Sequence, residues 1–173
     1  MDLWTAIERR RSVRRFSSTP VPQSDIERIL EAAIHAPSAG NRQPWHFIVV
    51  RNPGLREALA TAAGGQDFVA AAPVVIVVCA EPERSAARYG VRGRALYCLQ
   101  DTAAATEHML LAATALGLGS CWVGAFDEAA AARALSLPAA LRPIAMVPIG
   151  HPVAGGERAG SRRSPGEVTS WLD

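Results

Sequence analysis

The most constraining stretch of this 173-residue chain is the unbroken apolar run from Pro73 to Cys79, with sequence PVVIVVC. A strand with one face in water alternates apolar and polar residues, whereas this run has no polar position. It therefore predicts a central strand that is buried on both faces. Strand patterns at 47–50, 120–126 and 143–150 alternate along the chain with helical patterns. We expect a layered sheet of the α/β or α+β class, covered by helices on both sides.

Helical patterns fill much of the remaining chain and have recognisable starts and stops. Ser24 followed by Glu27 has the spacing of a capping box, which predicts a helix that begins there and stops at Pro37. Asp127 is a second expected N-cap. Further helices are expected at 2–11, 55–63, 95–116 and 128–135.

Three segments depart from an ordinary amphipathic pattern. The helix expected at 95–116 is apolar nearly all round over its second half, which indicates burial in a core or between subunits. Residues 81–93 are polar and irregular, so we expect a mobile surface segment or lid there. The stretch 153–173 shows little periodicity.

Length and composition favour one globular domain spanning residues 1–173, because 49% of the residues are hydrophobic and 20% are charged. No apolar run approaches the roughly 20 residues of a membrane span. No apolar segment of a secretory signal follows the N-terminal arginines, so the expected location is the cytoplasm. The net charge of +2 gives no reason to propose nucleic acid or a membrane as a partner.

Several common binding and catalytic motifs are absent from the sequence. No GxGxxG lies between a first strand and a helix, which argues against a Rossmann fold. A chain without lysine cannot form a P-loop, and GxSxG is also missing. Three cysteines and four histidines show neither a disulfide framework nor metal-ligand spacing, so no metal site is expected. Cys79 and Cys121 have apolar neighbours and are expected to be buried.

Five arginines lie within the seven residues 9–15, with Ser12 among them. Such a cluster is often a solvated charged face. Its members nevertheless repel one another unless an anion lies nearby, and a serine hydroxyl adds a neutral hydrogen-bond donor. A phosphate site is therefore one of two open interpretations. Because all 18 basic residues are arginine, any anion site in this chain uses guanidinium groups.

A second candidate is the loop 36–45, sequence APSAGNRQPW, between a predicted helix and a predicted strand. Small and polar residues dominate it, and two prolines bound it. Such a loop can bring backbone amides, an amide side chain and a hydroxyl against a planar polar ligand. The closing Pro44-Trp45 is better explained as the start of a strand with a core aromatic.

Four blocks of the sequence, taken together, resemble the compact branch of the FMN-dependent nitroreductase family. They are 10–16 (RRSVRRF), 36–45, 111–126 with GLGSCWVG inside it, and 148–152 (PIGHP). The resemblance covers the chain from about residue 5 to residue 150. It implies an α+β fold with a mixed sheet flanked by helices, in an intertwined homodimer that binds two FMN molecules at its interface. The apolar helix would then be dimer core, and the aperiodic C-terminal stretch would wrap the partner.

The resemblance also implies which residues bind the cofactor. The FMN phosphate and ribityl group would be held by Arg10, Ser12 and Arg14, with Arg11 a close second. Near the C-terminus, Arg163, or Arg162 with a shift of one residue, matches a family arginine that also reaches the phosphate.

The isoalloxazine ring would be contacted from two sides. The loop residues Pro37, Ser38, Ala39 and Asn41 would reach it from the other subunit, with Gln43 a weaker candidate. Backbone groups of Trp122, Val123 and Gly124 would face its polar edge, and Gln66 would lie toward the pyrimidine ring.

The expected activity is that of an FMN-dependent NAD(P)H oxidoreductase with a ping-pong cycle. NADH or NADPH would deliver hydride to flavin N5, and a nitroaromatic, a quinone or a similar small acceptor would then take the electrons. No catalytic acid or base is predicted. Alternatives are a same-fold reductase of enones, free flavin or dehalogenation substrates, a flavin-delivery protein with little turnover, and a general anion-binding domain. The polar residues Arg84, Arg88, Tyr89 and Arg92 would recognise substrate or nicotinamide phosphate, or form a solvated surface.

Overall fold

The computed structural model describes residues 1–154 and 160–172. Its helices and strands follow one another along the chain as α1 (Leu3–Arg9), α2 (Gln23–Ile34), a 3₁₀ turn (Ala39–Asn41), β1 (Trp45–Val50), α3 (Pro53–Ala62), α4 (Phe68–Ala71), β2 (Val74–Ala80), α5 (Pro82–Arg92), a π-helical turn (Gly93–Tyr97), α6 (Cys98–Ala115), β3 (Gly119–Ser120), α7 (Glu128–Ala134), β4 (Arg142–Gly150) and α8 (Pro165–Val168).

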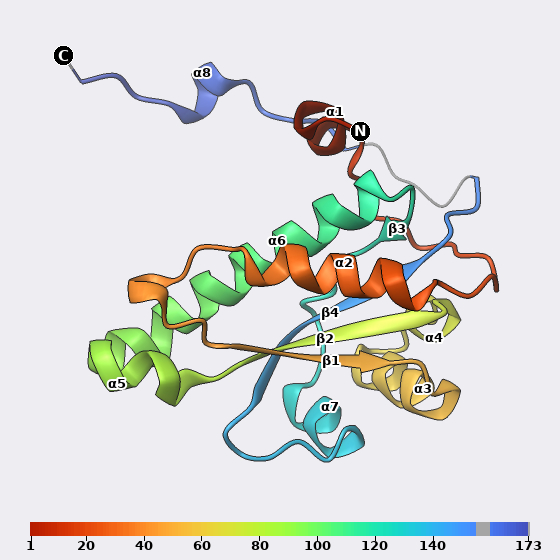
Figure 1. Ribbon diagram of the computed structural model, residues 1–173, viewed down its shortest axis with the longest axis horizontal. Helices are drawn as coiled ribbons and strands as arrows, with labels where there is room; N and C mark the ends of the chain where they lie inside the picture. The colour runs from red at the N-terminus through yellow and green to blue at the C-terminus, as the bar shows by residue number, and fades with distance from the viewer. Residues whose placement is uncertain (155–159, 173) are drawn as a thin grey trace.

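A four-stranded sheet with the order β1-β2-β4-β3 lies at the centre of the molecule (Figure 1). All seven residues of β2 are buried, which confirms the central strand expected from its apolar run. Ile76 and Val78 point into a core formed with α2 and α6, whereas Val75 and Val77 point into a second core formed with α3, α4 and α7. Alternation along a strand thus gives both faces of the sheet an apolar layer, and helices cover each.

The pairings between the strands are β1 with β2, β2 with β4 and β3 with β4, and each is antiparallel. The expectation of a mixed sheet is therefore wrong for the described residues, because their paired strands are all antiparallel; the parallel contact between Ser12 and Ser120 is an isolated bridge and not a pairing of strands. The strand expected over 120–126 is also shorter than predicted. Only Gly119–Ser120 pairs as a strand, and the chain returns to β4 through a single bridge at Val123.

Residues 81–93 are not irregular, in contrast to what their sequence pattern indicates. They form helix α5, in which Ser85 is fully buried, and a kink at Gly90 with φ of 54°. Gly93 lets the chain after α5 pack closely on Ser85, because a Cβ atom there would lie 2.6 Å from the carbonyl oxygen of Ser85. The polar residues of this segment belong to an amphipathic helix on the surface and not to an irregular loop.

The start of α2 also differs from the prediction. The helix begins at Gln23, with Pro22 as N-cap and no side-chain cap, so the expected box between Ser24 and Glu27 is not formed. Proline already has a helix-compatible φ of −55° here, which lets the first turn begin before Ser24. Asp127 does cap α7 as expected. A capping box occurs instead at Ser164 and Glu167, before α8.

Helix α6 crosses one face of the sheet, and its buried side includes Ala105, Met109 and Ala113. Its other side is half-buried in this chain, as at Leu111 and Ala112. Beyond β4 the chain runs into the tail 160–172, which is exposed throughout and extends past α1 away from the sheet (Figure 1). Part of the aperiodic stretch expected at 153–173, namely 155–159 and 173, lies outside the described residues.

Candidate functional site

The arginine-rich segment after α1 is fastened to β3 by Val13. The amide of Val13 donates to the carbonyl oxygen of Ser120 at 2.9 Å, and its side chain is buried with 5% exposed. Gly119 permits this approach, because a Cβ atom there would lie 2.8 Å from Val13 Cγ1. In an extended segment, the side chains of neighbouring residues point to opposite sides. Ser12 and Arg14 are thereby directed away from the core on either side of the buried Val13.

The arginines of this segment differ in how their guanidinium groups are used. Arg11 donates to the carbonyl oxygens of Glu8 and Arg10, so its side chain closes the end of α1. Arg10 has Nε 3.9 Å from Oε1 of Glu107, a distance at the edge of an ion pair. Arg14 lies over the Phe68 ring, 5.6 Å from its centroid. Arg10 and Arg14 therefore keep most of their hydrogen-bonding capacity for an anion, and Arg11 keeps less.

Ser12 forms a parallel bridge with Ser120 at the end of β3, next to the Cys121 thiol. Burial raises its pKa, and the pKa is lowered by the charge of Arg14, by a hydrogen bond with the Ser12 side chain and by the charge of Arg10. Arg10 and Arg14 lie two residues to either side of Ser12 in this extended segment, so all three side chains point to the same side of it, beside the end of β3. The structure thus brings together the residues predicted to hold a phosphate.

The segment 122–124 borders this cluster and offers free backbone donors. Val123 is buried, and it exchanges two backbone hydrogen bonds of 2.9 Å with Met146. Its amide is therefore already engaged. Among the described residues, no hydrogen bond engages the amides of Trp122 and Gly124. Trp122 is 37% exposed, and Gly124 is exposed as well. The open donors of this edge are thus those of Trp122 and Gly124, with Val123 as their anchor.

Gln66 joins the same region from the turn before α4. Its Nε2 donates to the carbonyl oxygen of Ala125 at 3.2 Å and to that of Ala63 at 2.9 Å. Both protons of the amide group are thus used to hold the turn against the segment after Gly124. Its amide oxygen is the group left to meet a ligand.

The loop 36–45 is held in one shape by local bonds and by three residues with positive φ. Ser38 Oγ accepts from the amide of Gln43 at 3.0 Å. Gly40, Asn41 and Gln43 have φ values of 55°, 54° and 51°. Trp45 is buried as the first residue of β1, as expected. The loop therefore presents Pro37 and Asn41, both exposed, on a rigid turn.

Asp101 on α6 anchors this loop and was not singled out from the sequence. Its Oδ1 accepts from the amide of Ala39 at 3.1 Å, and its side chain is buried with 6% exposed. Its Oδ2 is buried without a hydrogen-bond partner among the described residues. Burial raises the pKa of the carboxyl group, and the Ala39 amide lowers it. No clear sequence signal pointed to this role, because an acidic residue in the first turn of a helix is common.

The loop 36–45 and the arginine-rich segment 9–15 lie at opposite ends of α6 in this chain (Figure 1). The loop 36–45 lies beside α5, and the arginine segment lies beside α1 and β3. One chain therefore does not bring Pro37, Ser38, Ala39 and Asn41 to the cluster of Arg10, Ser12 and Arg14. Arg163 is also separate, since it lies on the extended tail and donates to the carbonyl oxygen of Glu167 at 2.5 Å.

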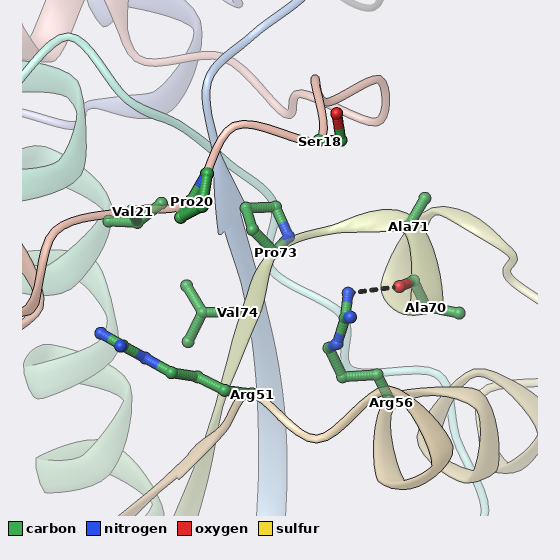
Figure 2. Close-up of a pocket in the computed structure, with 9 residues that line it drawn as sticks. All are labelled: Ser18, Pro20, Val21, Arg51, Arg56, Ala70, Ala71, Pro73 and Val74. Carbon is green, nitrogen blue, oxygen red and sulfur yellow. Dashed lines mark hydrogen bonds between the residues drawn. The ribbon is translucent and has the colours of Figure 1, made fainter.

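A cavity of about 490 Å³ lies elsewhere, between the turn before α2 and the start of β2. Figure 2 shows Arg56 turned toward Ala70, whose carbonyl oxygen accepts from Nη1 at 2.7 Å. The same nitrogen donates to the carbonyl oxygen of Ala72, so Arg56 closes the end of α4. None of the residues predicted for a site lines this cavity. It is therefore separate from the candidate site.

Metal-binding clusters and membrane-spanning helices are both missing from the described part of the chain. No group of three or more His, Cys, Asp or Glu side chains in residues 1–154 and 160–172 is placed to hold a metal ion. Within the same ranges, no helix has the length and apolar character needed to cross a bilayer.

Comparison with known proteins decides the family. Residues 7–66 and 61–151 match the model described as the nitroreductase family. The chain belongs to this family. Two relatives are similar over more than four fifths of their own length. A protein of Archaeoglobus fulgidus provisionally named NADH dehydrogenase/NAD(P)H nitroreductase is 40% identical over 147 residues, which cover 83% of this chain and 81% of that protein. An NADH dehydrogenase of Thermus thermophilus is 34% identical over 183 residues, which cover 90% of this chain and 89% of that protein.

Solved structures of the family have the same fold. A provisionally named nitroreductase from Desulfovibrio desulfuricans, crystallised in complex with FMN, is 33% identical with a TM-score of 0.88, over 100% of this chain and 98% of that chain. A nitroreductase family protein from Clostridium novyi is 34% identical with a TM-score of 0.81, over 92% of this chain and 89% of that chain. The expected family and α+β fold are thus confirmed. This chain is a nitroreductase-family oxidoreductase, and its family is one that uses NAD(P)H and binds FMN.

Proposed function

We propose that this chain binds FMN and uses it to pass electrons from NADH or NADPH to a small acceptor such as a nitroaromatic or a quinone. One observation carries the proposal. Ser12 is bridged to Ser120 at the end of β3, with Arg10 and Arg14 two residues to either side, and the segment that follows β3 has free amides at Trp122 and Gly124. Cations and a hydroxyl suit a phosphate, and backbone amides suit the polar edge of a flavin ring.

The residues present fit FMN by their chemistry. A phosphate dianion would relieve the repulsion between Arg10 and Arg14, and Glu107 competes weakly for Arg10 at 3.9 Å. Gly124 has no side chain to cover the edge, since a Cβ atom there would meet only the Trp122 ring, at 3.7 Å and 3.9 Å. The amide oxygen of Gln66 supplies an acceptor for an N–H group of the ligand.

A homodimer would unite the two halves of the site. The loop 36–45 would then approach the cofactor held by the arginine cluster of the partner subunit. Two exposed apolar surfaces support a partner: one on α1, where Trp4 is 73% exposed, and one on the tail, where Trp171 is 85% exposed. With the tail wrapped around the second subunit, Arg163 would reach the phosphate there.

When bound, FMN supplies the hydride chemistry, so the chain need not provide a nucleophile. The role of this chain is to hold and orient. Arg10 and Arg14 would hold the phosphate, and the amides of Trp122 and Gly124 would donate to the polar edge of the ring and favour negative charge there. The small side chain of Ala39 would leave the ring uncovered. Donor and acceptor would use the same site in turn, which would give ping-pong kinetics, with protons taken from solvent.

Purified protein tests this proposal. We expect it to take up FMN, seen as visible flavin absorbance, and to oxidise NADH or NADPH rapidly only when a nitroaromatic or quinone is added. Turnover is measured by nicotinamide absorbance with each donor and acceptor. A colourless protein that does not bind added FMN would contradict the whole proposal. Bound flavin without turnover on any acceptor would contradict the reductase and favour a flavin-delivery protein.

A further inference from the structure

Helix α5 lies directly on the loop 36–45, and arginines mediate the contact. Arg42 Nε donates to the carbonyl oxygen of Arg84 at 3.0 Å, and Arg84 Nε donates to that of Arg42 at 2.6 Å. Gly40 lies under the next turn of α5. A Cβ atom at Gly40 would be 2.5 Å from the hydroxyl of Tyr89 and 3.1 Å from Nη1 of Arg88. Arg42, Arg84 and Arg88 therefore gather at one edge of the loop.

The charge at this edge is poorly compensated. Arg84 has one distant carboxylate, with its Nη1 4.0 Å from Glu81. Among the described residues, neither Arg42 nor Arg88 has a carboxylate within 4.0 Å. Arg88 instead lies 5.5 Å from the centroid of the Tyr89 ring. Of these three arginines, only Arg84 thus has a carboxylate within 4.0 Å in the described part of the chain, and that contact is at the limit of an ion pair.

Other arginines of the same chain are paired closely. Arg94 donates two bonds of 2.7 Å to Glu83, and Arg142 donates two bonds of 2.8 Å to Glu128. These pairs lower the pKa of both glutamates. Carboxylate partners are therefore available to arginines near α5, yet the three at the loop are left with an excess of positive charge. Like charges gathered in this way favour an anion between them.

We propose that Arg42, Arg84 and Arg88 form a subsite for the phosphate or carboxylate group of a substrate, with the Tyr89 hydroxyl as a neutral donor. This inference rests on the proposed function, because it takes the loop 36–45 to border the cofactor. Two substrates could carry such an anionic group. One is NADPH, through the 2′-phosphate that distinguishes it from NADH, and the other is an electron acceptor with a carboxylate. Guanidinium forks bind both groups through charge-assisted hydrogen bonds.

Arg88→Met is the main test, because this substitution keeps an apolar stem beside Tyr89 and removes the charge. Arg88→Lys keeps the charge without the fork. Arg133→Met on α7, away from the loop, is the matched control for loss of one positive charge. For each variant, FMN occupancy is recorded first by absorbance. The binding constants of NADP⁺ and NAD⁺ are then measured by calorimetry, and kcat/KM is measured with NADPH, NADH, 4-nitrobenzoate and nitrobenzene.

Because Arg88→Met removes one charge-assisted hydrogen bond, we expect it to lower one of two kcat/KM ratios by about tenfold or more: NADPH to NADH, or 4-nitrobenzoate to nitrobenzene. A fall in the NADPH-to-NADH ratio, seen also as a fall in the NADP⁺-to-NAD⁺ affinity ratio, identifies the donor phosphate. A fall in the nitrobenzoate-to-nitrobenzene ratio identifies the acceptor carboxylate. Arg88→Lys should restore part of the loss. Ratios equal to those of Arg133→Met would overturn the subsite while leaving FMN binding in place, whereas failure of the unsubstituted protein to bind FMN would contradict the proposed function itself.

Discussion

Replacing Arg10 and Arg14 together by alanine should raise the dissociation constant for FMN by about a hundredfold or more. Each arginine is expected to donate at least one charge-assisted hydrogen bond to the phosphate, and each such bond contributes about 1.5–3 kcal/mol. Both side chains are available for this role, because Arg10 has one weak carboxylate neighbour and Arg14 lies over the Phe68 ring. Fluorescence titration of the flavin measures the effect.

The control for this pair is a double substitution that removes the same charge elsewhere, Arg28→Ala on α2 with Arg133→Ala on α7. It should leave the FMN dissociation constant within about threefold, since exposed charges at a distance are screened by salt. Thermal unfolding of the FMN-free proteins verifies that both variants fold. Equal weakening of FMN binding in the two double variants would show that net charge, and not the cluster at the end of β3, holds the phosphate.

Gly40→Ala should destabilise the chain by about 2–4 kcal/mol, because two costs combine there. The φ of 55° lies in the left-handed region, and the new Cβ atom would lie 2.5 Å from the Tyr89 hydroxyl. Tyr89 cannot withdraw freely, since its ring packs edge-on against Tyr97 with centroids 5.1 Å apart. Denaturant unfolding measures the loss. The loop and α5 should move apart, so FMN affinity should fall as well.

Gly64→Ala separates the two costs. Gly64 has φ of 70°, but a methyl group added there would meet no atom within 4 Å, so it should show the dihedral cost alone, about 1–2 kcal/mol. Tyr89→Phe removes the clashing oxygen. In that background Gly40→Ala should cost little more than Gly64→Ala, because the remaining close neighbour, Arg88, is an exposed side chain that can move; a double-mutant cycle would reveal this. If Gly40→Ala and Gly64→Ala cost the same in the unsubstituted chain, the close contact between loop and α5 is wrong.

Much of the sheet could be predicted because its residues carry strong local signals. The run at β2 has no polar position, and burial of all seven strand residues follows from that. Trp45 as a core aromatic and Asp127 as a helix cap were also local features. The cluster of Arg10, Ser12 and Arg14 is compact in sequence, so a short extended segment anchored by Val13 was enough to bring the three together.

What the sequence did not predict depends on contacts between distant residues. Helix α5 looked irregular because its polar side faces water, and its packing on the loop depends on Gly40 and Gly93. Asp101 acquires its role only through the amide of Ala39, which lies 62 positions away in the sequence. The free amides at Trp122 and Gly124 follow from the bridge between Val123 and Met146. No local pattern reports a pairing of this kind.

The most direct test of the shared site is the FMN content of a mixed dimer. One subunit carries Arg10→Ala with Arg14→Ala, the other carries Ser38→Ala with Asn41→Ala, and two affinity tags allow the mixed species to be isolated. In a two-fold dimer with sites built from both chains, one site contains all the substitutions and the other contains none. We therefore expect about one FMN per mixed dimer, against about two in the unsubstituted dimer and markedly less in either doubly substituted homodimer. If the mixed dimer instead binds no more FMN than the average of the two homodimers, the cluster and the loop do not meet across an interface, and the account is contradicted.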